Sequence, residues 1–307
     1  IVRIGDNAGD GDGFKSIHIG EYAGNNQGDG AASAINIGQY AGSGAGGDYN
    51  IAMGSHAGYD FDDGSDHNVS IGFQAGYSCY GDESIYIGYN AGYGIDGDTD
   101  ANSRRVVIGS VALFDGWEQD GTIAIGYRAG YYAPSGSNNV LMGYQAGAEI
   151  NNDTDRNKFS VFSDNVFIGF YAMYGAESAS ASTDRQMQGN VAIGRYAGFE
   201  AESTSHFGNA TFVGHYAGAN SDRAYGNTAV GNSAFRDGDG AYNLSLGYNV
   251  GYGVDGQYNI LLGYQAGINC VGDYNIEIVT DGAATSILNG YSDKIHIEDT
   301  IVGDTVE

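Results

Sequence analysis

Several residue types are scarce in this chain, and each scarcity excludes a class of protein. With one proline in 307 residues, a Pro-rich disordered segment is excluded, and the 53 glycines do not follow the strict Gly-X-Y period of collagen. Lysine and arginine number only 12 against 38 acidic residues, so the net charge is −26 and nucleic acid is not an expected partner. No apolar run approaches the ~18 residues of a membrane-spanning helix, so membrane insertion is not expected.

A short phrase recurs about fifteen times: an apolar residue, Gly, two variable residues and Ala-Gly. It reads MGSHAG from Met53 to Gly58 and LGYQAG from Leu262 to Gly267, and its commonest spacings are 16 and 17 residues. Such a period indicates one small unit stacked on copies of itself. It disfavours an enzyme, because a catalytic site needs a few unlike residues at one place. We therefore expect no enzymatic activity.

The residues around the recurrent glycine predict short strands. The residue before it is Ile, Val, Leu or Met in every copy, and the third before it is mostly apolar, whereas the residue between them varies from Ala52 to Tyr86 and Phe167. This alternation predicts a strand with its constant face buried. Alanine three residues after the glycine predicts a second buried strand beyond a bend. Each rung would then be two short strands around a thin core of Ile, Val and Ala.

These observations predict an all-β fold, a parallel β-solenoid of about 15 rungs of ~16 residues. The repeat array spans residues 1–278, and residues 279–307 form a C-terminal strand segment or connector. The open first rung predicts that the chain is a piece of something longer or a processed product.

An asparagine stands four residues before the glycine in many rungs. The set includes Asn50, Asn68, Asn139, Asn165, Asn190, Asn227, Asn243 and Asn259. At one corner of each turn it predicts a ladder of side-chain amides that bond along the axis. A plain turn requirement explains the same residue, because Asn tolerates left-handed backbone.

Aromatic residues also recur at fixed places, one, two or five residues after the glycine. Tyr89, Tyr40 and Tyr59 are examples of the three series. Such rows suit burial against neighbouring chains. The alternative is that they form aromatic ladders covering the roll's own surface.

The two cysteines, Cys79 and Cys270, lie seven residues after Gly72 and Gly263. They therefore occupy equivalent places on rungs that lie far apart along the chain. At ~4.8 Å per rung they would be roughly 50 Å apart, well beyond disulfide reach. We expect free thiols, with pairing between chains as the alternative.

The repeat resembles those of trimeric fibre proteins. Asn-x-x-Ile-Gly is similar to the rung motif of trimeric autotransporter adhesin heads, and phrases such as IGYNAG from Ile87 to Gly92 resemble the arrays of phage tail fibres and large bacterial surface proteins. The resemblance implies a left-handed β-roll, a homotrimer and an extracellular location on a virion or cell surface. It separates neither a phage from a cellular origin nor a trimer from a polymer.

Three consecutive long spacings, from Gly143 to Gly214, predict loops that stack into one lateral protrusion. These loops concentrate rare basic residues beside phenylalanines, and they predict a receptor or subunit contact at Arg156, Lys158, Phe159, Phe162 and Arg185. Drifted, solvent-exposed loops are the alternative. Trp117, the only tryptophan, suits stacking on a host-surface glycan or capping a seam between chains.

Asp-Gly clusters offer oxygen-rich loops that suit Ca²⁺, although turns favour the same residues. The candidate ligands are Asp10, Asp12, Asp96, Asp98, Asp237 and Asp239. No other cofactor is expected.

The sequence thus favours a structural and adhesive fibre segment that attaches through lateral loops. An extracellular filament subunit that polymerises head to tail is the alternative. A glycan-cleaving tailspike is a third and less favoured reading, because it would require carboxylates that converge in a groove.

Overall fold

The computed structural model is all-β and confirms the parallel β-solenoid. It describes residues 1–9, 15–26, 33–61, 65–95, 103–115, 119–150, 161–178, 186–203, 207–279 and 295–297. These residues contain no helix, and so none that could cross a membrane. The chain forms two compact units, residues 1–168 and 169–307. The left-handed sense and the trimeric state stay predictions.

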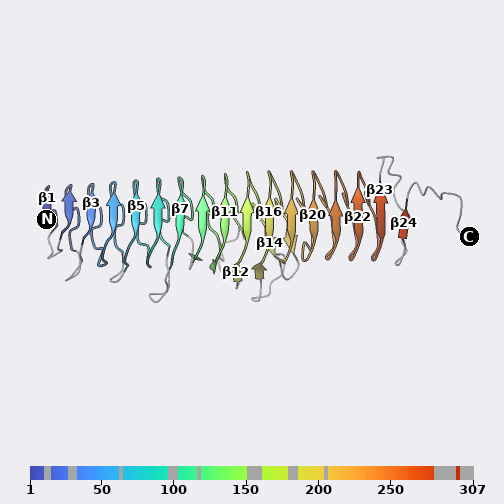
Figure 1. The fold of residues 1–307 in the computed structure, drawn as a ribbon, viewed down its shortest axis with the longest axis horizontal. Coiled ribbons are helices and arrows are strands. Elements are labelled where there is room, and N and C mark those ends of the chain that lie inside the picture. The colour runs from blue at the N-terminus through green and yellow to red at the C-terminus, as the bar shows by residue number, and fades with distance from the viewer. Residues whose placement is uncertain are drawn as a thin grey trace, which may run out of the picture. The chain divides into compact units, whose positions relative to one another are not determined.

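In the first unit, ten three-residue strands pair in parallel and in chain order (Figure 1). They are β1 (Val2–Ile4), β2 (Ile17–Ile19), β3 (Ile35–Ile37), β4 (Ile51–Met53), β5 (Val69–Ile71), β6 (Ile85–Ile87), β7 (Val106–Ile108), β9 (Ile123–Ile125), β11 (Val140–Met142) and β13 (Val166–Ile168). The unit also contains β8 (Gln119–Asp120), which pairs with β10 (Gly136–Ser137), and β12 (Val161–Ser163). Each repeat therefore returns the chain to the same place, one strand further along.

In the second unit, seven strands pair in the same way. They are β16 (Val191–Ile193), β19 (Thr211–Val213), β20 (Thr228–Val230), β21 (Leu244–Leu246), β22 (Ile260–Gly263), β23 (Ile276–Val279) and β24 (Ile295–Ile297). Two insertion loops of this unit also pair with each other, β14 (Glu177–Ser178) with β17 (Glu202–Ser203) and β15 (Gln186–Gln188) with β18 (Phe207–Gly208). These two insertions therefore stack on one another, as their consecutive places in the repeat predict.

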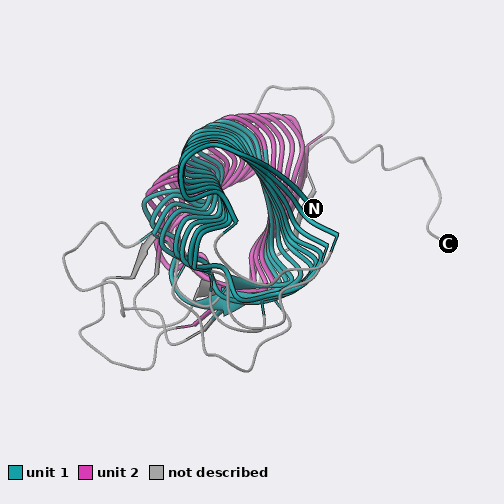
Figure 2. Cartoon of the chain, turned by 90° about the vertical axis from the view of Figure 1, so that its left-hand side faces the viewer, with its two compact units in different colours: residues 1–168 teal, residues 169–307 magenta. Residues whose placement is uncertain are grey.

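The strands bury the opposite face from the one the sequence indicates. The variable middle residue points inward, so that Ala52, Tyr86 and Phe167 are 0 to 2% exposed. The constant residues on either side point outward, and Ile71 and Ile85 are 37% and 36% exposed. The prediction of a core of Ile and Val was wrong, because alternation shows which residues share a face and not which face is inside. In Figure 2 the turns of each unit overlap in projection around an interior that the middle residues and the alanines fill.

The segment after each recurrent glycine is a series of turns, so the predicted second strand is wrong. In the turn that follows β3, φ is positive at every second residue: 134° at Gly38, 56° at Tyr40, 59° at Gly42 and 76° at Gly44. An extended strand cannot contain this alternation. The turns stack through main-chain hydrogen bonds to both neighbours, from Gly38 N–H to Ile19 O at 2.7 Å and from Gly42 N–H to Ala57 O at 2.8 Å.

The asparagine ladder forms along the axis, and most of its bonds join a side chain to the main chain. The amide oxygen of Asn243 accepts the N–H of Asn259 at 2.9 Å, and that of Asn259 accepts the N–H of Asn275 at 2.8 Å. The amide nitrogen of Asn243 donates to Gly256 O at 2.9 Å. Each buried amide is therefore held by the next turn, which fixes the register of the strand that follows.

His18, the middle residue of β2, makes the first turns sensitive to pH. It is buried, and its Nδ1 lies 3.1 Å from Asn36 Nδ2, which makes Nδ1 an acceptor and the ring neutral. Burial first, and the charge of Arg3 next, lower the pKa of His18 below its ordinary 6.5. The unfolded chain therefore binds a proton at a pH where the fold does not, and stability is lost as pH falls below 6.5.

We expect the urea midpoint to fall between about pH 7.5 and about pH 5, and to fall less in His18→Asn, which copies Asn36 on the next turn. Carboxylates titrate equally in both proteins, so the difference between the two pH dependences isolates His18. An identical dependence in the variant would contradict the assignment.

Candidate functional site

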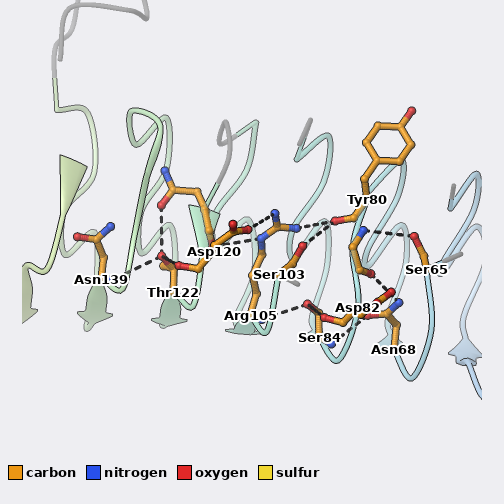
Figure 3. Close-up of polar contacts among 12 residues, drawn as sticks. Ser65, Asn68, Tyr80, Asp82, Ser84, Ser103, Arg105, Asp120, Thr122 and Asn139 are labelled. Carbon is orange, nitrogen blue, oxygen red and sulfur yellow. Dashed lines mark hydrogen bonds and ion pairs between the residues drawn. The ribbon is translucent and has the colours of Figure 1, made fainter. Parts of the chain in front are cut away.

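Arg105 takes the place of a ladder asparagine, four residues before Gly109 and directly before β7. Its side chain is 1% exposed and belongs to the largest fully buried side chains. Figure 3 shows the guanidinium between the turn that carries Tyr80 and the turn that carries Asp120. The ladder positions on the two flanking turns are hydroxyl residues, Ser84 and Thr122. Arg105 is therefore the centre of an internal polar network.

The guanidinium donates to oxygen atoms of the two turns that flank its own. Nε donates to Gln119 O at 3.2 Å, and Nη1 donates to Tyr80 O at 2.9 Å and to the Tyr86 hydroxyl at 3.3 Å. Nη2 lies 3.5 Å from Asp120 Oδ1, and this carboxylate, which is partly exposed, is the ion-pair partner. The buried cation is thus held mainly by neutral oxygens.

Hydroxyl groups connect the network to the asparagine ladder. Ser84 Oγ accepts the N–H of Arg105 at 3.1 Å, and Asn68 Oδ1 accepts the N–H of Ser84 at 2.9 Å. On the other side, Thr122 Oγ1 accepts the N–H of Asn139 at 3.5 Å. Bonding along the axis therefore continues across turns that have no ladder asparagine.

The buried thiol and phenol beside Arg105 are neutral at physiological pH. Burial raises the pKa of Tyr86 to about 12 and that of Cys79 to about 11, although Arg105 opposes both shifts. For Arg105 itself burial lowers the pKa, but the interactions with Tyr86, Cys79 and Asp120 outweigh this, and the net pKa is raised. A thiol and a phenol that keep their protons are poor nucleophiles. The network is suited to holding turns together.

A second candidate site is the outward face of the strands, here called the outer apolar face. It consists of the outward strand residues and the aromatic residues that directly follow the recurrent glycine. The members that are well exposed are Val2, Ile4, Met53, Ile71, Phe73, Ile85, Tyr89, Tyr127 and Tyr144 in the first unit and Phe170, Ile193, Val230, Tyr248, Ile260, Tyr264 and Ile278 in the second. Register pairing places equivalent residues side by side, as with Met53 and Ile71. The face is therefore a continuous apolar row within each unit.

Aromatic rings also stack along the surface of each unit. Ring centroids of Tyr59 and Tyr77 are 5.0 Å apart and those of Tyr77 and Tyr93 are 4.9 Å apart, with planes within 13°. Tyr196 and Tyr216 stack at 4.8 Å in the second unit. The sequence left ladders and burial against other chains as alternatives. The ladders are present, whereas the row that directly follows the glycine belongs to the outer apolar face.

Most residues of the predicted receptor contact lie outside the described residues. These are Arg156, Lys158, Phe159, Arg185 and Trp117. Phe162 is described, and it lies in the interior, fully buried, with its ring centroid 6.2 Å from that of Phe167. In this position it packs the core and is not presented to a partner.

Two of the predicted calcium ligands are described, and both have partners within the chain. Asp239 accepts two hydrogen bonds from Arg223 at 2.6 and 2.8 Å, and Asp237 accepts one from Asn220 at 3.0 Å. Asp10, Asp12, Asp96 and Asp98 lie outside the described residues. In the part of the chain that is described, no three His, Cys, Asp or Glu side chains are grouped to hold a metal ion.

Cys79 and Cys270 are both described, buried and free. The Cys79 thiol donates to Gly92 O, and burial raises the pKa of each thiol to about 11. Both therefore act as small interior residues, seven positions after the glycine, as their equivalent places indicate.

Comparison with known proteins adds no relative. No family model, no curated protein and no solved structure matches this chain.

Proposed function

We propose that this chain is a structural and adhesive fibre segment on the outside of a virion or cell, in which three copies pack through their outer apolar faces. The observation that carries this proposal is the exposure of a parallel sheet. Parallel sheets are normally covered on both faces, and here the chain covers only the inner one. A continuous exposed apolar row is typical of an interaction site.

The period of the outer apolar face favours a second copy as the partner. Its side chains recur once per turn, as the pairing of Ile71 with Ile87 and of Leu246 with Leu262 shows. A partner that fills the grooves between turns must have the same spacing over many turns. A second copy of the same chain has this spacing necessarily. Most soluble oligomers are closed, symmetric assemblies of identical chains. The resemblance to trimeric fibre proteins points to three copies.

We assign attachment to the lateral loops that the long spacings from Gly143 to Gly214 predict. Two of these loops contain the paired strands β14 and β17, and β14 lies below the main strands in Figure 1. The net charge of −26 favours solubility of the fibre, since like charges on different particles repel. The proposal includes no catalytic step.

The test is the mass of the particle in solution. We expect the intact chain to have the mass of a discrete trimer by light scattering. Ile71→Arg should weaken association about 100-fold, because each copy would bury an unpaired charge. Ile71 points outward, so the fold of the single chain should survive, which circular dichroism checks.

His67→Arg is the matched control, because it adds a charge at an exposed position before the same strand. The equivalent position before β7 is naturally Arg104. This control should remain trimeric. A monomeric parent chain, or equal masses for Ile71→Arg and the parent, would refute the proposal. An open polymer would support the head-to-tail filament instead.

A further inference from the structure

Three tyrosines of the second unit form a stack, here called the tyrosine ladder, that the proposed function does not use. Tyr242, Tyr258 and Tyr274 each directly precede a ladder asparagine. The centroids of successive rings are 5.0 Å apart in both pairs, and the ring planes differ by 2° and 6°. Tyr171 and Tyr196 of this unit are similarly parallel, at 4°, but their ring centroids lie further apart, at 5.6 Å.

The backbone holds these rings in register. All three residues have left-handed backbone, with φ of 60°, 60° and 59°. Tyr258 N–H donates to Ala241 O at 3.2 Å and Tyr274 N–H donates to Gln257 O at 3.0 Å. The asparagines that follow are bonded from turn to turn. The rings are therefore kept in place by the same ladder that sets the strand register.

The stack leaves the ring edges accessible. The tyrosines are 46%, 44% and 52% exposed, although neighbouring rings cover the inner faces of the stack. The edge of a phenol carries its hydroxyl group and the two ring carbons beside it. These are the atoms that react when a phenol loses one electron and its proton. Equivalent reactive carbons of adjacent turns therefore face solvent side by side.

We propose that the tyrosine ladder is a site of oxidative cross-linking, where a dityrosine bond joins successive turns. A one-electron oxidant, such as a haem peroxidase with hydrogen peroxide, removes one electron from each of two phenols, and each phenolic proton passes to water. The two radicals form a carbon–carbon bond between their ortho carbons. The ortho hydrogens then move to the oxygens and restore both rings. Two tyrosines and one peroxide thus give one dityrosine and two waters.

Neighbouring aromatic contacts lack either the parallel register of the tyrosine ladder or its accessible ring edges. Tyr225 meets Tyr242 edge to face, with planes at 80°, so the reactive carbons are not in register. Tyr248 and Tyr264 stack at 5.3 Å but belong to the outer apolar face, which the proposed assembly covers. The cross-link needs only one chain, and it would tie turns together whether or not copies associate.

The experiment is photo-oxidation of the intact folded chain with a ruthenium complex and persulfate. The product is then unfolded, cleaved before aspartate and analysed by mass spectrometry. Cleavage before Asp255, Asp273 and Asp281 releases fragments 255–272 and 273–280, and the second contains Tyr274 as its sole tyrosine. We expect these two fragments to be joined with the loss of two hydrogen atoms.

Tyr258→Phe should abolish that joined product, since phenylalanine keeps the stacked ring but not the phenol. Tyr264→Phe, the other tyrosine of fragment 255–272, should leave it unchanged. Oxidation in concentrated urea should reduce its yield at least tenfold, because the register is then lost. The proposal is overturned if the product persists in Tyr258→Phe, if urea leaves its yield unchanged, or if oxidised tyrosines appear elsewhere while Tyr274 stays unlinked.

Discussion

Replacing Gly38 by alanine is expected to destabilise the first unit by about 3 kcal/mol or more. A Cβ at this position would lie 2.5 Å from the carbonyl oxygen and 2.6 Å from the carbonyl carbon of Gly54, on the next turn. Its φ of 134° is also a backbone conformation that residues with a side chain rarely adopt. The hydrogen bond from Gly54 N–H to Ile37 O holds the two adjacent turns together, so neither segment can move away.

Gly44→Ala, in the same turn, is the matched control. Its φ is also positive, at 76°, but a Cβ there would meet the main chain of Asp60 only at 3.5 Å. The equivalent residues of the next turns are Asp60 and Ser78, which adopt the same backbone with a side chain. We expect a loss of about 1 kcal/mol. Urea unfolding followed by circular dichroism compares the two variants, and equal losses would show that stacking of glycine on glycine does not limit the fold.

Replacing Arg105 by methionine is expected to cost about 3 kcal/mol. Methionine fills a similar volume, but it leaves Gln119 O and Tyr80 O without the donor that the buried guanidinium supplies. It also removes the bond to the Tyr86 hydroxyl in the interior. Arg105 joins its own turn to the turns before and after it, so hydrogen exchange should rise in β6, β7 and β9 together.

Arg104→Met provides the comparison at the adjacent position. Arg104 forms an ion pair with Glu83 at 3.1 Å, and both side chains are well exposed. Such pairs contribute less than about 1 kcal/mol, so this variant should be close to the parent chain in stability. If Arg105→Met matched Arg104→Met or exceeded the parent in stability, the network would not be a stabilising connection between turns.

The fold class could be predicted from the sequence because close stacking of turns requires a glycine at the same place in each repeat. A glycine is required wherever turns stack as Gly38 stacks on Gly54, so the phrase marks every circuit of the chain. The asparagine position was also informative, because a buried amide such as Asn243 satisfies the same main-chain groups in each turn. Local requirements that recur at every turn are visible in a single sequence.

The buried face could not be predicted, because alternation is symmetric between inside and outside. Constancy along the repeat predicts a core position, yet the interior tolerates variation from Ser70 to Tyr86 on successive turns. The ring of Tyr86 occupies space beside Gly92, where a side chain would collide with it. A large inward side chain is thus accommodated by a glycine beside it. The outward residues stay alike, which is what a shared contact along the whole row would require.

Arg105 was missed because nothing in its spacing marks it. It stands where a ladder asparagine is expected, beside a second arginine, and sequence alone does not tell which of the two is buried. Its burial depends on three acceptors from other turns, Gln119, Tyr80 and Tyr86, which come together only in the fold. The predicted receptor and calcium residues fall mostly outside the described residues, and so they stay predictions.

The most direct test of the account is an electron density map of the assembled particle in cross-section. We expect three copies whose outer apolar faces, with Ile71 in the first unit and Ile260 in the second, meet at the centre and exclude water. The loop side of each turn, where β14 and β17 pair, would then face outward. A map in which Ile71 and Ile260 face solvent, or in which the loops form the contact, would contradict it.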